Sequence, residues 1–176
     1  VPVATLLLSG IAVSQTLSAT MSIIMILNKQ SMDQIMFWTM GSLNGKGWGQ
    51  IITVLPYSLL GIALLLTTCR ELDIMLTGEE TAIQLGVNVE SLKKRVLFAS
   101  TVITAAVISV TGIIGFVGLV VPHVVRMITG PKHRVLMPLS LLFGGTFLII
   151  CDTAARSMAV WEIPVGIITS LCGGPF

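Results

Sequence analysis

Residues 111–134 read TGIIGFVGLVVPHVVRMITGPKHR and interrupt an otherwise continuous apolar run. The interruptions are Gly112, Gly115 and Gly118, followed by Pro122, His123 and Arg126. Inside a bilayer, the backbone can leave the helix only where protein or a water-filled cavity satisfies its polar groups. A simple membrane anchor would not tolerate so many breaks. The segment therefore indicates a membrane protein that moves something across the bilayer.

The composition is that of an integral membrane protein. Of the 176 residues, 54% are hydrophobic and 10% are charged, and the mean hydropathy is +0.97. Soluble domains carry about 25% charged residues. The net charge of +2 is too small to indicate a nucleic-acid partner. The three cysteines (Cys69, Cys151 and Cys172) lack metal-ligand spacing and are expected to pack as small apolar residues. Because the chain starts at Val1 and not at Met, we expect a piece of a larger protein or a processed one.

The uncharged runs predict the membrane-spanning segments, each of which needs about 20 apolar residues. The runs cover residues 1–27, 51–69, 96–122, 135–151 and 164–176. As one helix, the third run would be about 40 Å long, which a hydrocarbon core of about 30 Å holds only with strong tilt. We therefore divide it into a helix over 91–111, a break at 112–118 and a short helix over 119–129. The predicted fold is all-α: a single membrane domain over 1–176 with about five helices, the last one cut short.

The distribution of Lys and Arg predicts the orientation in the membrane. Alternating the spans places on one side Arg70, Lys93, Lys94, Arg95, Arg126, Lys132 and Arg134. The other side receives Lys29, Lys46 and Arg156. Cytoplasmic loops carry the excess of basic residues. We therefore expect residues 70–95 and 130–134 to be cytoplasmic and residues 28–50 to be external.

The external segment 28–50 contains a methionine row. Met32, Met36 and Met40 recur every four residues, so residues 31–40 are predicted to form a short interfacial helix with Trp38 at headgroup level. The row is compatible with copper binding. Because neither His nor Cys accompanies it, a flexible packing surface is the favoured interpretation.

Residues 70–95 form a charged loop that is predicted to contain a short helix. Thr77 and Glu80 have the spacing of a capping box, and Gly86 is a natural left-handed stop. Asn88 can cap the helix that re-enters the membrane. Ala82, Ile83 and Leu85 give the short helix one apolar side. Two interpretations stay open: an ordinary loop helix, and a docking element for a cytoplasmic partner, since ordering such an element costs conformational entropy.

Five collinear blocks of this chain resemble the FecCD-type permeases of ABC importers, which take up iron–siderophore complexes, haem and cobalamin. The blocks are MFWTMGSLNGKGW (36–48), LTGEETAIQLGVN (76–88), GIIGFVGLVVPHVVRMITGPKHRVLMPLS (112–140), CDTAARSM (151–158) and EIPVGIITSLCGGPF (162–176). The resemblance covers essentially the whole chain. It implies a fragment of a ten-helix permease, from helix five to most of helix ten, in a bacterial or archaeal cytoplasmic membrane. Implied partners are membrane lipid, a second permease copy, two ATPase subunits and a periplasmic or lipid-anchored binding protein.

The resemblance also implies roles for particular residues. A coupling helix that inserts into the ATPase would comprise Thr77, Gly78, Glu79, Glu80, Ala82, Ile83, Leu85 and Gly86, with Ile83 and Leu85 as anchors. Arg156 would meet acidic residues of the binding protein; the alternative is an intrachain pair with Asp152 or with Glu162. The helix over 4–27 would face the translocation pathway through small or weakly polar residues, or would use them for close packing: Gly10, Ser14, Thr16, Ser18 and Ser22.

The remaining features argue for transport and against catalysis. The chain has no G-x-x-x-x-G-K-[ST] loop, so ATP hydrolysis is expected on a partner, and neither a cofactor nor a resident metal is expected. His123 and Arg126 invite a proton-relay interpretation, but a structural role is favoured. The alternatives are a non-transporting membrane fragment that serves as a helix-packing module and, less favoured, an intramembrane enzyme. Against the enzyme, His123 and His133 lie ten residues apart.

Overall fold

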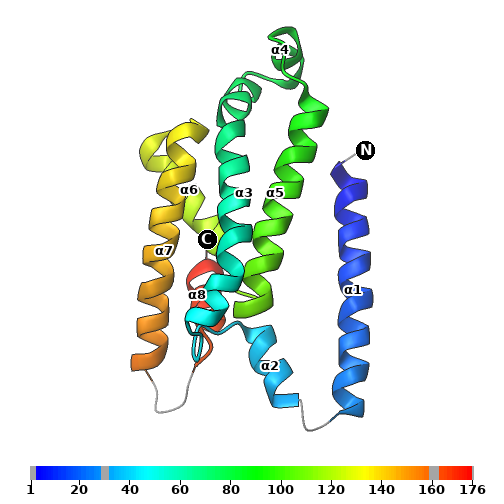
Figure 1. The fold of residues 1–176 in the computed structure, drawn as a ribbon, viewed down its shortest axis with the longest axis vertical. Helices are drawn as coiled ribbons and strands as arrows, with labels where there is room; N and C mark the ends of the chain where they lie inside the picture. The colour runs from blue at the N-terminus through cyan, green and yellow to red at the C-terminus, as the bar shows by residue number, and fades with distance from the viewer. Residues whose placement is uncertain (1–2, 29–31, 159–162, 176) are drawn as a thin grey trace. The chain divides into compact units, whose positions relative to one another are not determined.

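The computed structural model describes residues 3–28, 32–158 and 163–175 (Figure 1). All regular structure in these ranges is helical, as predicted. The helices form two compact units, Val1–Thr39 and Met40–Phe176. Lys29 and Glu162, which entered the predictions above, lie outside the described residues.

The first unit contains α1 (Val3–Leu27) and nearly all of α2 (Met32–Met40). The predicted short helix over 31–40 is therefore confirmed as a helix. Hydroxyl groups along α1 bond to their own helix: Thr16 Oγ1 donates to the Ala12 carbonyl and Ser22 Oγ to the Ser18 carbonyl, both at 2.9 Å. These side chains thus satisfy their donors without leaving the helix, which allows them to face lipid or a close-packed neighbour.

The second unit is built on two antiparallel helices, α3 (Trp48–Met75) and α5 (Val89–Thr111), which are packed against each other (Figure 1). The short α4 (Glu79–Gln84) connects them. Close approach is possible at Gly61 of α3, where any Cβ would overlap the Ile103 side chain of α5. Helix α7 (His133–Ser157) also packs against α3. It contacts in addition α6 (Val117–Thr129) and α8 (Val165–Gly173).

Four of the described helices are long and apolar enough to cross a membrane: Leu7–Leu27 within α1, together with α3, α5 and α7. At most 11% of each apolar window is buried within the structure. Most of the apolar surface must therefore face lipid or other protein. The fifth apolar segment begins at Val165, close to the predicted start at 164, but α8 has only 9 residues. Helix α6, with 13 residues, is too short to span a bilayer.

The interruption after α5 is shorter than predicted. Helix α5 ends at Thr111 and α6 begins at Val117, so Gly112 and Gly115 lie in the break but Gly118 and Pro122 lie inside α6. The helix resumes earlier because Phe116 takes the left-handed conformation (φ 65°) at its N-cap. Pro122 cannot donate to the Gly118 carbonyl four residues earlier. These two residues mark a weakened turn within α6 and do not belong to the break.

Candidate functional site

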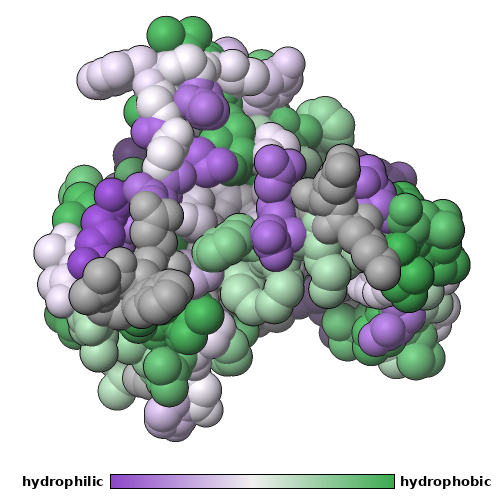
Figure 2. Space-filling view, turned by 90° about the horizontal axis from the view of Figure 1, so that it is seen from below, coloured by the Kyte–Doolittle hydropathy of each residue, from purple (hydrophilic) through white to green (hydrophobic). Residues whose placement is uncertain are grey.

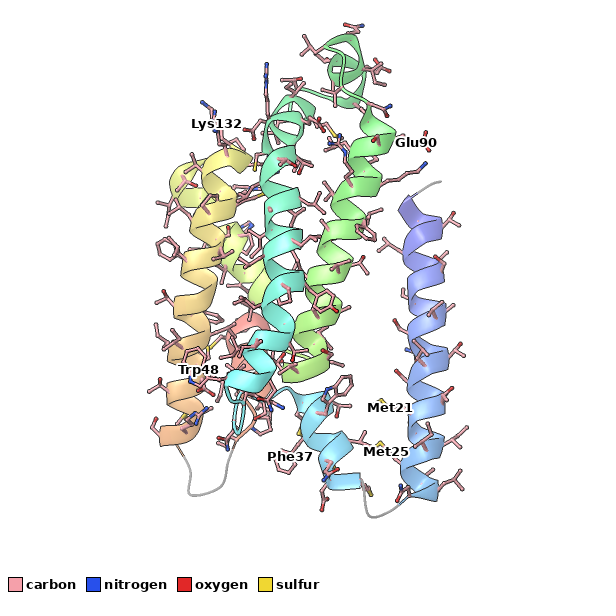
Figure 3. The ribbon with its side chains drawn as sticks, in the orientation of Figure 1. Met21, Met25, Phe37, Trp48, Glu90 and Lys132 are labelled. Atoms are coloured by element: carbon pink, nitrogen blue, oxygen red, sulfur yellow. The ribbon has the colours of Figure 1, made fainter. Side chains whose placement is uncertain are left out.

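The loop 70–95 lies at one end of the second unit, beyond the hydrophobic length of α3. With 28 residues, α3 is about 42 Å long, whereas the hydrocarbon core of a bilayer is about 30 Å thick. The last turns of α3 therefore project out of the membrane and carry α4 with them. Glu90 and Lys132 lie at this end and Trp48 at the other (Figure 3).

The start of α4 differs from the predicted capping box. Thr77 Oγ1 donates to the Ile74 carbonyl at 2.7 Å and so belongs to the turn that ends α3. The N-cap residue is Gly78, with φ 112°, and no side chain caps the helix there. This backbone conformation suits only glycine. The capping-box prediction for Thr77 and Glu80 was wrong because the chain turns between α3 and α4 at Gly78, one residue later than expected.

The end of α4 matches the prediction. Gly86 has φ 84°, and two bonds close the turn: the Gly86 amide donates to the Ile83 carbonyl at 2.9 Å, and the Val87 amide to the Ala82 carbonyl at 3.0 Å. This pair of bonds defines a Schellman motif. Asn88 Oδ1 then accepts from the Ser91 amide at 3.0 Å and caps α5, also as predicted. The backbone of the loop is therefore fixed by local bonds.

The apolar residues of α4 do not form one side. Ala82 is fully buried against Val87, Val89 and Leu92, whereas Ile83 and Leu85 are 59% and 63% exposed. The methyl group of Ala82 anchors α4 to the start of α5, and the two larger side chains remain in solvent. A short helix with two large exposed apolar side chains is what a docking element requires.

Ion pairs tie the loop to the flanking helices. Glu79 pairs with Lys93 at 2.7 Å and Glu71 pairs with Arg95 at 2.6 Å. These side chains are half-exposed, so each pair contributes about 0–1 kcal/mol. The carboxylate of Glu79, which the resemblance places in the coupling helix, thus has a partner in the same chain.

A contact that sequence reasoning missed joins α3 to α7 at the same end. Asp73 Oδ1 accepts from the His133 backbone amide at 2.5 Å and lies 3.0 Å from His133 Nδ1. One turn deeper, Cys69 Sγ lies 3.4 Å from Met137 Sδ. Asp73 thus caps α7 from another helix. Because the partners are 60 residues apart, no local spacing could have revealed the contact.

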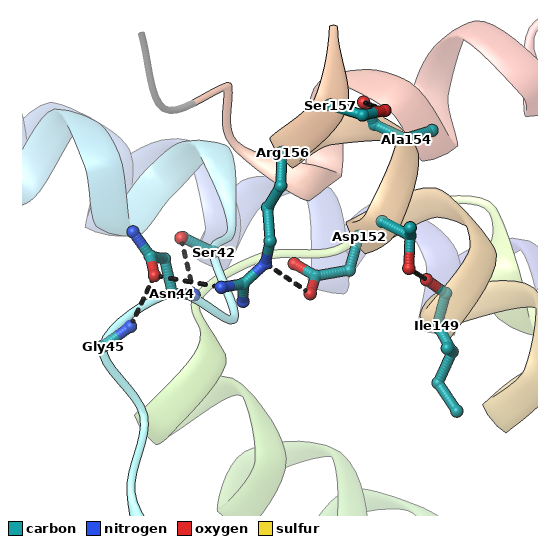
Figure 4. Close-up of polar contacts among 9 residues, drawn as sticks. Ser42, Asn44, Gly45, Ile149, Asp152, Ala154, Arg156 and Ser157 are labelled. Atoms are coloured by element: carbon teal, nitrogen blue, oxygen red, sulfur yellow. Dashed lines mark hydrogen bonds and ion pairs between the residues drawn. The ribbon is translucent and has the colours of Figure 1, made fainter. Parts of the chain in front are cut away.

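At the opposite end of the unit, Arg156 makes intrachain contacts (Figure 4). Its Nε donates to Asp152 Oδ2 at 2.8 Å, and its Nη1 donates to Asn44 Oδ1 at 3.3 Å. The pair with Asp152, which was one of the alternatives, is therefore confirmed. The Arg156 side chain remains 53% exposed, so a role in docking the binding protein stays a prediction.

The break at 112–116 is held by backbone contacts with two other segments. The Ser42 amide donates to the Thr111 carbonyl at 2.8 Å, and the Gly166 amide to the Gly41 carbonyl at 3.2 Å. A Cβ at Gly41 would overlap the Ile113 carbonyl, and one at Gly166 would overlap the Met40 carbonyl. The segment that first suggested movement is thus a close-packed joint between the end of α2, the end of α5 and the start of α8.

The other predicted residues are not gathered into a site. Gly10, Ser14, Ser18 and Ser22 are exposed residues of α1, and their pathway role stays a prediction. Met32, Met36 and Met40 are all exposed. Arg126 lies in the last turn of α6, as expected from its place in the sequence. Among the described residues, no group of three His, Cys, Asp or Glu side chains is placed to hold a metal ion.

These long apolar helices define a polytopic membrane protein. The model of the FecCD transport family matches residues 2–176. The chain belongs to this family, whose permeases are multi-pass proteins of the bacterial or archaeal inner membrane.

Named relatives and a solved structure agree with this assignment. The chain is 49% identical over 99% of its length to a cobalamin import system permease of Halobacterium salinarum, of which it covers 47%. It is 41% identical over 98% of its length to a hemin transport system permease of Yersinia pestis, covering 52%. The chain therefore spans about half the length of these curated relatives. A solved structure of an inward-facing ABC transporter assigned to the metal-chelate type matches 98% of this chain and 57% of its own, with 33% identity and a TM-score of 0.92.

Proposed function

We propose that this chain belongs to the membrane-spanning subunit of an ATP-driven importer for a metal chelate. The family assignment and the relatives for cobalamin and hemin support this cargo class. The working permease would be a dimer that associates with two ATPase subunits and receives cargo from a separate binding protein. In this proposal the weakly polar α1 face with Gly10, Ser14, Ser18 and Ser22 lines the pathway. Such a face suits cargo that is already chelated, because strong metal ligands would retain it.

The coupling proposal rests on how α4 is held and on which of its side chains are exposed. The helix is fixed at its C-terminal end by the Schellman motif and anchored by the buried Ala82 methyl group. It presents Ile83 and Leu85 to solvent. An element that is anchored on one side and apolar on the other can transmit a displacement from a partner into α3 and α5. Glu80, which makes no ion pair within the described residues, is free to contact a basic ATPase residue.

The test uses the full-length permease and its ATPase. We expect Leu85→Asp to weaken their association by at least tenfold, because a carboxylate would be buried in an apolar groove at a cost of about 2 kcal/mol or more. Ile83→Asp should act in the same way. The matched control is Leu76→Asp, since Leu76 is also an exposed leucine of this loop but caps the end of α3, whereas Leu85 caps the end of α4. Association is measured by co-purification and by titration in detergent.

The outcome also separates the alternatives. A helix-packing module would show no ATPase association in any variant. An intramembrane enzyme would keep its activity when Leu85 is replaced. If the unsubstituted permease binds the ATPase and Leu85→Asp binds equally well, the assignment of α4 as the coupling helix is wrong, although the importer function would stand.

A further inference from the structure

The structure contains an apolar groove that the transport proposal does not use. It lies between the first turns of α3 and the last turns of α5, at the end of the unit opposite to α4, and encloses about 320 Å³. Ile51, Val54 and Leu55 line it from α3, and Val107 and Val110 line it from α5. All these residues belong to the second unit, so the groove is formed by one compact body.

The depth of the groove corresponds to one leaflet of a bilayer. Trp48, the first residue of α3, is 78% exposed, and exposed tryptophans at helix ends lie at the level of the lipid headgroups. Ser58, the deepest α3 residue of the groove, is ten residues further along α3, or about 15 Å at ~1.5 Å per residue. Half of a hydrocarbon core is also about 15 Å thick. The groove therefore runs from the headgroup region to near the middle of the membrane.

A cation stands at the headgroup end of the groove. Lys46 lines the groove two residues before Trp48. The nearby polar groups are already engaged: Gln50 Oε1 accepts from the Gly47 amide at 2.9 Å, and Asp152 is paired with Arg156. In the part of the chain that the structure describes, Lys46 makes no ion pair. Seen from below, the surface at this end carries hydrophilic residues next to hydrophobic ones (Figure 2).

From the depth, the apolar lining and the unpaired cation, we propose that this groove binds an anionic glycerophospholipid. One hydrocarbon chain of the lipid lies along Ile51, Val54 and Leu55, and its phosphate lies at the Lys46 ammonium group. A basic residue near a membrane surface favours anionic lipid by about 1 kcal/mol, or about fivefold in affinity. The bound lipid would fill the space between α3 and α5 where their side chains diverge, and would thereby hold the external ends of these two helices together.

The test labels the full-length permease in lipid nanodiscs with a phosphatidylglycerol that carries a photoreactive diazirine near the end of one acyl chain. We expect labelled peptides within residues 50–58, and unlabelled phosphatidylglycerol should compete about fivefold better than phosphatidylcholine of the same chains. Lys46→Gln should abolish this preference, and Lys46→Arg should keep it. Because Lys46 is exposed and lies in a loop, we expect neither substitution to affect folding.

A second pair of variants tests the groove itself. Val54→Trp should fill the groove and reduce labelling severalfold. Ile52→Trp, on a neighbouring α3 position that is 68% exposed and outside the groove, should not. If both lipids compete equally and Lys46→Gln has no effect, the labelling comes from non-specific contact with the surrounding lipid. This result would overturn the proposal. Labelling at Ile52 with none at Val54 or Leu55 would show that another protein segment covers the groove, which also overturns it.

Discussion

The close contact at Gly166 shows how one missing methyl group determines the joint between three helices. The Gly166 amide donates to Gly41, and the space where a Cβ would lie is filled by the Met40 carbonyl oxygen. Since the obstacle is backbone, it cannot move aside as a flexible side chain would. The start of α8 can therefore lie against the end of α2 only with glycine at this position.

Replacing Gly166 with alanine should therefore destabilise the second unit. We expect Gly166→Ala to lower the free energy of unfolding by about 1–3 kcal/mol, the range for overpacked sites. Gly145→Ala is the control, because Gly145 lies within α7 with open space around its Cα; helix propensity predicts a gain of about 0.5–1 kcal/mol there. Unfolding in mixed micelles of SDS and mild detergent measures both. Equal effects of the two substitutions would contradict the joint described above.

At the same scale, the sequence predicted local interactions and missed distant ones. The Asn88 cap, the Gly86 stop and the pair of Asp152 with Arg156 all join residues within four positions of each other, so spacing alone reveals them. The bond from His133 to Asp73 crosses 60 residues and depends on how α3 and α7 pack. Tertiary packing of that kind leaves no local pattern in a single sequence.

Helix α4 depends for its order on a few contacts at its C-terminal end. Six residues are too few to form an isolated helix in water. Its stability comes from the Schellman motif at Gly86 and from the packing of Ala82. The sequence correctly predicted where α4 ends, because glycine marks a left-handed residue. It placed the start wrongly, because Thr77 can serve equally well in the last turn of α3.

A substitution at Gly86 should destabilise α4 without creating a steric clash, since nothing lies within 4 Å of the position that a Cβ would take. At φ 84°, an alanine costs about 1–2 kcal/mol. We expect Gly86→Ala to raise the hydrogen-exchange rates of amides in residues 82–87 by about five- to thirtyfold. Gln84→Ala, within the same helix and with a better helix former, should leave these rates unchanged or lower. Unchanged exchange in Gly86→Ala would show that the Schellman motif does not hold α4.

At the scale of the second unit, the charge distribution and the structure agree on which segments share an end. The predicted cytoplasmic group, residues 70–95 and 130–134, is brought together by the bond between Asp73 and His133. Of the predicted external group, Asn44 and Arg156 are joined by a hydrogen bond within the second unit. Hydropathy also predicted the order of the four described long helices, whereas the fifth predicted segment contains only the 9-residue α8. It overestimated the break at 112–118, because glycine content alone does not show where a helix resumes.

The orientation can be tested with single cysteines in a background where Cys69, Cys151 and Cys172 are replaced by alanine. In intact cells with a permeabilised outer layer, a membrane-impermeant maleimide should label Lys46→Cys and should not label Glu80→Cys. After disruption of the cytoplasmic membrane, both should react. Both native side chains are exposed in the structure, so a lack of reaction reports on sidedness. The reverse pattern would invert the topology, and with it the proposed ATPase side.

The shortness of α6 has a consequence for how the protein is made. The long helices α3, α5 and α7 can each enter the bilayer on their own and associate afterwards. Helix α6, with 13 residues, cannot span the membrane alone, and its ends would expose unsatisfied backbone groups to lipid. Stable insertion of α6 therefore requires α7, against which it packs. During synthesis, the segment after α5 would thus stay with the insertion machinery until α7 has emerged, so that α6 and α7 are released into the lipid together.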